Sequence, residues 1–138
     1  MKANDLMIGD YVYIKSSDGE DTHIVKVKTI EESGINLFNG FIEFSELEPI
    51  PLTKEILKKN GFKTDGKNLI LHYMDGIHES ALYLSEMYMV VPPGYVTGTP
   101  NLLMKERPCN IDVFGEIHYV HDLQHLYKFR KIKKEIIL

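Results

Sequence analysis

Short hydrophobic runs alternate with polar positions throughout residues 1–50. The period of two is clearest in "DYVYIKS" and "THIVKVKTI", which are also rich in β-branched side chains, a combination typical of strands. Asn39-Gly40 separates two further hydrophobic runs and favours a two-residue hairpin turn. Residues 1–50 are therefore predicted to form an SH3-like β-barrel or a bent sheet of short antiparallel strands.

The stretch "EPIPLTKEILKKNGF" breaks this alternation. Its two prolines prevent a regular strand ladder, and Thr53 is a suitable N-cap for a helix. Glu55 would lie in the first turn of that helix and two lysines in the last, which suits the helix dipole. Asn60-Gly61 supplies the left-handed exit that commonly ends a helix. The sequence therefore predicts a short helix over residues 53–60.

The segment "NLILHYMDGIHESALYLSEMYMVV" fits two patterns. Asp75-Gly76 favours a hairpin turn between two strands, with "EMYMVV" as a third strand. The alternative is a helix over residues 77–91, because the hydrophobic positions there also follow helical spacing. These positions are Ile77, Ala81, Leu84, Tyr88 and Val91. The explicit turn signal and the tyrosines favour strands.

A second helix is predicted over residues 120–130. At about 100° per residue, its hydrophobic side chains fall on one arc, while His121 and His125 fall on the opposite side and would face solvent or a groove. The hydrophobic arc consists of Val120, Leu123, Leu126 and Tyr127. "KEIIL" at the end of the chain is predicted to be a last short strand. The fold class is thus α+β, mostly antiparallel, with residues 51–138 packed against the N-terminal strands or continuous with them.

Composition limits the classes of function. The formal net charge of −4 and pI near 5.8 argue against a general nucleic-acid coat, although "KFRKIKK" (128–134) is a local basic segment. The single cysteine, Cys109, forms no internal disulfide and makes a cytoplasmic setting the default. No segment approaches the roughly 20 apolar residues of a membrane span. A protein partner or self-association is favoured over nucleic acid, and no membrane is expected.

The stretch "GEIHYVHDLQHLYKF" carries three of the six histidines. His118, His121 and His125 form one candidate set of metal ligands, and a metal-assisted hydrolase is the corresponding alternative function. A zinc-protease helix carries the motif H-E-x-x-H, but the residue that follows His121 is not Glu. "HD" at residues 121–122 suggests a metal-dependent phosphohydrolase, but no Asp follows Asp122, which excludes that family. A polar helix surface explains the histidine pair more simply.

A second candidate set lies at the predicted hairpin. With Asp75-Gly76 as its loop, His72 would lie opposite Glu79, and Tyr73 opposite His78. A His–Glu pair can do acid–base work, although ordinary cross-strand pairing also explains these residues. The sequence shows neither a phosphate-binding loop nor a nucleophile elbow.

The leading hypothesis from the residues is a non-enzymatic binding or accessory module that needs no cofactor. Its predicted binding surface combines the polar helix face with adjacent cations and one aromatic ring: His121, His125, Lys128, Arg130 and Tyr119. Small barrels commonly present a groove or a sheet edge to a ligand. A structural or oligomeric protein that pairs through its strand edges is the remaining alternative.

Four segments of the chain resemble a pattern shared by small proteins of gut anaerobic bacteria and their phages. They are "LMIGDYVYI", "EPIPLTKEILKKNGF", "IHYVHDLQHLYKF" and "KEIIL", so the resemblance spans nearly the whole chain. The resemblance implies a bacterial or phage protein of the cytoplasm. Because the group has no established activity, the resemblance implies no catalytic residue. His125 stands where the pattern has Asn, so the resemblance does not imply a His121–His125 metal pair.

Overall fold

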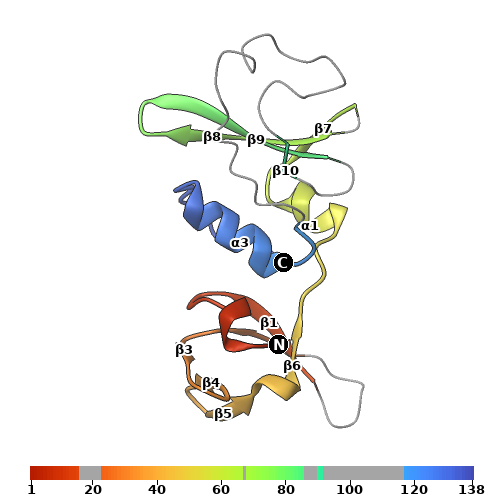
Figure 1. Cartoon of the computed structure of the whole chain (residues 1–138). Helices are drawn as coiled ribbons and strands as arrows, with labels where there is room; N and C mark the ends of the chain where they lie inside the picture. The colour runs from red at the N-terminus through yellow and green to blue at the C-terminus, as the bar shows by residue number, and fades with distance from the viewer. Residues whose placement is uncertain (16–22, 67, 86–89, 92–116) are drawn as a thin grey trace. The chain divides into compact units, whose positions relative to one another are not determined.

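In the part of the chain that the computed structural model describes, there are two α-helices, and short antiparallel strands form three small sheets (Figure 1). This confirms the predicted α+β class with mostly antiparallel strands. The structure describes residues 1–15, 23–66, 68–85, 90–91 and 117–138. The chain forms two compact units: unit 1 is Met1–Pro51 with Tyr119–His125, and unit 2 is Leu52–His118 with Leu126–Leu138. Within the described ranges, no helix has both the length and the hydropathy needed to cross a membrane.

Unit 1 contains two three-stranded antiparallel sheets, in the orders β2–β1–β6 and β3–β4–β5. The strands of the first sheet are β1 (Tyr11–Ile14), β2 (His23–Lys26) and β6 (Leu47–Pro49). Those of the second are β3 (Thr29–Ile30), β4 (Gly34–Leu37) and β5 (Gly40–Glu43). Single 3-10 turns, η1 (Ala3–Asp5) and η2 (Phe44–Glu46), precede β1 and β6. No ladder joins the two sheets among the described residues, so a closed barrel is not formed there.

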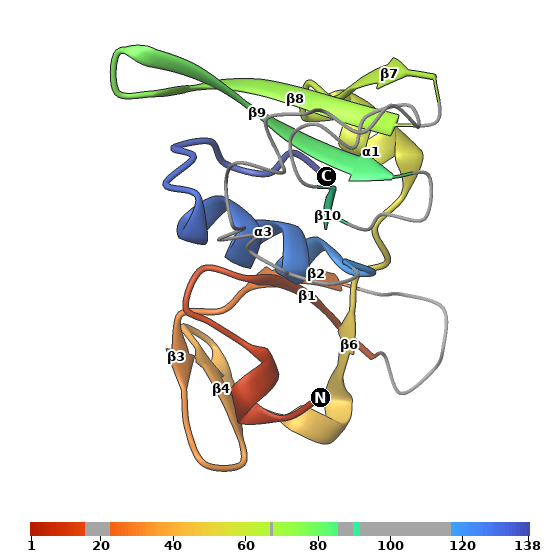
Figure 2. The same ribbon diagram turned by 45° about the horizontal axis from the view of Figure 1, so that its top comes forward.

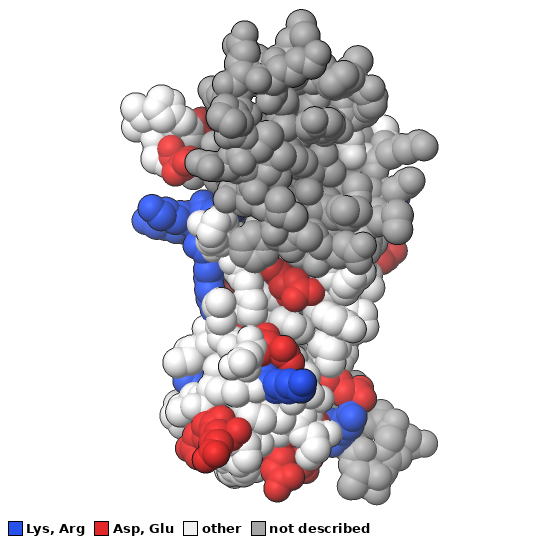
Figure 3. Space-filling model, viewed as in Figure 1, with Lys and Arg blue, Asp and Glu red and all other residues white. Residues whose placement is uncertain are grey.

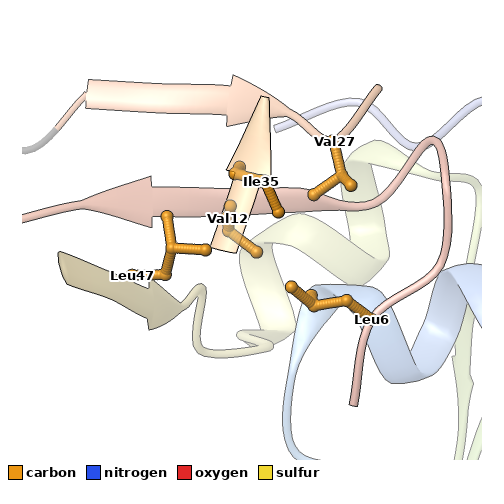
Figure 4. Close-up of a cluster of buried hydrophobic side chains, with 5 residues drawn as sticks. All are labelled: Leu6, Val12, Val27, Ile35 and Leu47. Atoms are coloured by element: carbon orange, nitrogen blue, oxygen red, sulfur yellow. The ribbon is translucent and has the colours of Figure 1, made fainter. Parts of the chain in front are cut away.

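Residues of these strands and of the segments next to them meet in the hydrophobic core of unit 1 (Figure 4). Leu6, Val12, Val27, Ile35 and Leu47 are all buried and point toward one another. Val12 is in the middle of β1 and Ile35 in β4, so both sheets contribute to one cluster. Burying a side chain of this kind contributes about 1.5–3 kcal/mol. The period-two pattern therefore identified the core side of these short strands.

The turn between β4 and β5 differs from the prediction by one residue. Leu37 pairs with Gly40, so the loop is Phe38-Asn39 rather than Asn39-Gly40. Gly40 adopts a φ of 148° at the first position of β5, a conformation that other residues rarely adopt. The glycine is therefore used to start the strand, and Phe38 is left at the tip of the hairpin.

Unit 2 contains a four-stranded antiparallel sheet in the order β10–β9–β8–β7. Its strands are β7 (Lys63–Asp65), β8 (Asn68–Asp75), β9 (His78–Ser85) and β10 (Val90–Val91). The strand prediction is thus confirmed for the described residues of 77–91, and the helical alternative is wrong there. The side chains of Leu69, Leu71 and Leu82 are buried.

The register of the β8–β9 hairpin corrects the predicted pairs. Asp75 pairs with His78, and the loop is Gly76-Ile77, because Gly76 takes the positive φ of 65° at the first loop position. His72 consequently lies opposite Ala81. Its Nδ1 is still 3.5 Å from Glu79 Oε1, as a diagonal neighbour rather than a direct partner.

Helix α1 (Lys54–Lys59) has the ends that the sequence predicts. The N-cap Thr53 accepts a hydrogen bond from the backbone N–H of Ile56 at 3.2 Å. At the other end Gly61 has a φ of 90°, and the N–H of Phe62 bonds to the carbonyl of Leu57 at 3.1 Å, which is the Schellman arrangement.

The C-terminal segment forms no strand, so the prediction for "KEIIL" is wrong. Instead, the side-chain amide of Asn60 pairs with the backbone of Ile137. Its Oδ1 accepts from the N–H of Ile137 at 2.7 Å, and its Nδ2 donates to the carbonyl oxygens of Ile137 at 2.8 Å and Ile56 at 2.7 Å. One amide side chain therefore performs the pairing that a neighbouring strand would have provided.

We expect Asn60→Ala to lower the free energy of unfolding by about 1–3 kcal/mol, because it leaves several backbone groups without their partner. Urea unfolding measures this loss, and amide exchange at Ile137 should become faster. Lys59→Ala is the matched control, because Lys59 makes one exposed hydrogen bond to Leu138. An equal loss in both variants would contradict the role of the Asn60 amide.

Candidate functional site

A tight turn from Met7 to Asp10 forms one side of the candidate site. The N–H of Asp10 bonds to the carbonyl of Met7 at 3.1 Å, and Asp10 Oδ2 accepts from the N–H of Met7 at 2.6 Å. Gly9 has a φ of 97° at the third position of the turn, where a type II turn requires positive φ. The backbone of Val27 pairs with the same turn. Its carbonyl accepts a hydrogen bond from the N–H of Gly9 at 2.7 Å, and its N–H donates to the carbonyl of Asp10 at 2.8 Å.

Helix α3 (Val120–Phe129) begins beside this turn. The N–H of Val120 donates to the carbonyl of Ile50 at 2.9 Å, and Asp122 Oδ2 accepts from the N–H of Tyr119 at 2.9 Å. Asp122 therefore acts as a cap in the first turn of the helix. The "HD" doublet has a helix-capping role here.

The side chain of Gln124 joins the helix to the backbone on both sides of Asp10. Its Oε1 accepts from the N–H of Tyr11 at 2.8 Å, and its Nε2 donates to the carbonyl of Gly9 at 2.9 Å. Both views of the ribbon show the first turns of α3 next to the start of β1 (Figure 2). Residues separated by 113 and 115 positions in the chain are thus held together by one amide.

His125 adds a further polar contact to this junction between helix α3 and the Met7–Asp10 turn. Its Nε2 lies 2.6 Å from Asp10 Oδ2, and the Asp10 side chain is completely buried. The same carboxylate oxygen therefore accepts hydrogen bonds from the imidazole and from the N–H of Met7. A charge-assisted hydrogen bond of this kind offsets part of the cost of burying the carboxylate.

His121 lies between two aromatic rings. Its ring stacks on that of Tyr119 at 5.5 Å between centroids and meets His125 edge-on at 5.7 Å. Only 5% of His121 is exposed, and its Nδ1 is buried without a hydrogen-bond partner among the described residues. Burial lowers the pKa of His121, against the opposite effects of Asp122 and Asp10. Its imidazole is therefore neutral at neutral pH.

The structure corrects the prediction that His121 and His125 lie on a solvent-facing side of α3. The hydrophobic arc is buried as predicted, but His121 is also buried and His125 is mostly covered. His125 is covered because it contacts Asp10, while its neighbour Gln124 donates to the carbonyl of Gly9 in the same turn. The binding surface predicted from the sequence is divided between the units. Its residues Tyr119, His121 and His125 lie together in unit 1, whereas Lys128 and Arg130 belong to unit 2.

The two histidine sets do not make metal centres. Over the described ranges, the structure brings together no group of three or more His, Cys, Asp or Glu side chains that could hold a metal ion. This covers His118, His121 and His125 as well as His72, His78 and Glu79. His72 and Glu79 form only an exposed pair on the hairpin.

The residues that organise this junction, Gly9, Asp10 and Gln124, are absent from the predicted site. The only local signal was the Gly-Asp pair before β1, which is equally typical of an ordinary turn. Comparison of the chain with protein-family models, with curated proteins and with solved structures finds no match. The geometry indicates a buried polar network that attaches the helix to the turn.

The lowered pKa of His121 predicts an acid-sensitive fold. Because the unfolded chain has the ordinary pKa near 6.5 and the folded chain a lower one, the unfolded chain takes up the proton first. The free energy of unfolding should therefore fall as the pH drops below about 6.5 toward the folded-state pKa.

Urea unfolding between about pH 7.5 and about pH 5 tests this prediction. His121→Phe, which keeps a flat ring in the stack, should lose less stability over this range than the unaltered chain. Replacement of the exposed His78 by Gln is the control. A fall of the same size in His121→Phe would show that another group causes the pH dependence.

Proposed function

We propose that unit 1 is a non-enzymatic module that binds another polypeptide, and that its strands are an SH3-like small barrel or bent sheet. The binding surface in this proposal is the outer face of the β3–β4–β5 sheet. The proposed setting is the bacterial cytoplasm, with the protein encoded by a bacterium or by a phage. This part of the proposal rests only on the resemblance of the sequence motifs to those of small proteins of gut anaerobic bacteria and their phages.

The strand register separates the two faces of this sheet. Ile35 pairs with Ile42, and both contribute to the core cluster. Because successive side chains point to opposite faces, the next row, Thr29, Asn36 and Phe41, lies on the outer face. Phe38 follows at the tip of the same hairpin. Two aromatic side chains are thus available on one small sheet.

The observation that carries the proposal is the exposure of these two rings. Phe38 is 88% exposed and Phe41 42% exposed. Complete burial of a side chain of this size contributes about 1.5–3 kcal/mol, and folding of unit 1 leaves most of that unused at Phe38. Aromatic side chains on a surface are typical anchors of protein interfaces.

Gly34 keeps Phe41 in place on the outer face. A Cβ atom at Gly34 would lie 2.7 Å from Phe41 Cζ and 2.1 Å from the carbonyl oxygen of Ile42, so only glycine fits beneath the ring. The outer strands β3 and β5 each pair only with β4 among the described strands. An extended segment can therefore lie against the rings or add to an edge of the sheet.

Charge distribution favours a polypeptide over nucleic acid. In the lower part of Figure 3, which is unit 1, small groups of acidic and basic side chains lie among uncharged ones. The formal net charge of the chain is −4. Nucleic-acid binding depends on neutralising many phosphates with Lys and Arg. The mixed charges on the side of unit 1 seen in Figure 3 are poorly suited to this.

Selection of short random peptides on the full chain tests the proposal. We expect enriched peptides to bind Phe38→Ser about tenfold more weakly, because an anchor ring is lost. Ile77→Ser is the matched control, since Ile77 is 89% exposed in unit 2, and it should bind like the unaltered chain.

Circular dichroism and urea unfolding establish that both variants fold. Failure to enrich any peptide, or equal binding by Phe38→Ser, would contradict a binding site on this face. A dimer in light scattering that depends on Phe38 would assign the face to a second copy of the chain instead.

A further inference from the structure

A lysine side chain lies on the exposed ring at the tip of the β4–β5 hairpin. Lys28 Nζ is 3.4 Å from the centroid of the Phe38 ring, and both residues are exposed. A cation–π contact at such an exposed site is weakly stabilising. The contact fixes a positive charge directly beside the most exposed aromatic side chain of unit 1.

Two carboxylates of the same sheet, those of Glu31 and Glu43, have partners within the chain. Glu31 Oε1 accepts a hydrogen bond from the side chain of Asn36, and Glu43 Oε2 accepts from the hydroxyl of Ser45 at 3.3 Å. By contrast, no carboxylate of a described residue lies within ion-pair distance of Lys28 Nζ. Lys15 shows the usual arrangement in this unit, 3.1 Å from Glu48 Oε1.

We infer that the polypeptide bound by this face carries an Asp or Glu close to a hydrophobic residue, and that Lys28 selects it. This inference rests on the proposed function. The hydrophobic side chain covers the ring of Phe38, and the carboxylate pairs with the ammonium of Lys28. Covering the ring also removes water around the ammonium, and the ion pair gains strength as the local dielectric constant falls.

The geometry of an extended chain defines the spacing. In a strand, side chains at alternate positions lie on one face, about 7 Å apart along the chain. A hydrophobic residue and an acidic residue separated by one position therefore both reach the Phe38–Lys28 pair. The expected ligand is an extended segment with the order hydrophobic, any residue, acidic, or the reverse.

The test compares peptides selected by four forms of the full chain: unaltered, Lys28→Arg, Lys28→Glu and Phe38→Ser. The unaltered chain and Lys28→Arg should enrich peptides with an acidic residue within two positions of a hydrophobic one. Lys28→Glu should lose this enrichment and favour Lys or Arg in its place. In an enriched peptide, Glu→Gln should weaken binding to the unaltered chain about fivefold and should strengthen binding to Lys28→Glu, because it removes a like-charge repulsion.

The outcomes separate this inference from the proposed function. Peptides that need Phe38 but show no acidic preference, or keep it with Lys28→Glu, would overturn the role of Lys28 and leave the binding module standing. If no peptide depends on Phe38, both proposals fail. Because Lys28 is exposed and loses only its contact with the Phe38 ring, Lys28→Glu should unfold at a urea midpoint only slightly below that of the unaltered chain, so that a change of preference reports on binding.

Discussion

The fully buried carboxylate of Asp10 is the constraint on which unit 1 depends. A buried charge is costly unless it is paired and hydrogen-bonded, and Asp10 meets this requirement with His125 Nε2 and the N–H of Met7 on one oxygen. The helix that supplies the imidazole must therefore stay next to the turn. Gln124 strengthens the same junction through two further hydrogen bonds on either side of Asp10.

The consequences of this junction extend into the sheets. Gly9 and Asp10 exchange backbone hydrogen bonds with Val27, and Val27 is part of the hydrophobic cluster that Ile35 of β4 also enters. Lys28 follows Val27 directly, so its position beside Phe38 depends on the same pairing. In this account, the buried polar junction stabilises the strands, and the exposed outer face of β3–β4–β5 is left for a partner. Stability and binding are thus assigned to different residues of one unit.

Features that depend on neighbouring residues could be predicted from the sequence. Thr53 and Gly61 end helix α1 because capping is a local property of the backbone, and the strands of unit 1 follow from the period-two pattern. The two hairpin turns were misplaced by one residue, since a glycine satisfies positive φ either inside the loop or at its border. Gly40 starts a strand, whereas Gly76 opens a loop.

The candidate site could be predicted less well. His121 and His125 were identified as unusual residues, but the position of His125 depends on Asp10, which is 115 positions away. Helical periodicity places a polar residue opposite the hydrophobic arc and cannot anticipate that a buried turn will bind it. Asn60 illustrates the same limit, because its partner Ile137 is 77 positions away.

A double-mutant cycle on Asp10→Asn and His125→Gln tests the central claim most directly, with urea unfolding of the two single variants, the double variant and the unaltered chain. If the junction stabilises unit 1, the two substitutions should be coupled by about 1–3 kcal/mol, because each single change leaves a buried polar group without its partner. Additive losses, with a coupling energy near zero, would show that the two side chains are neighbours without depending on each other.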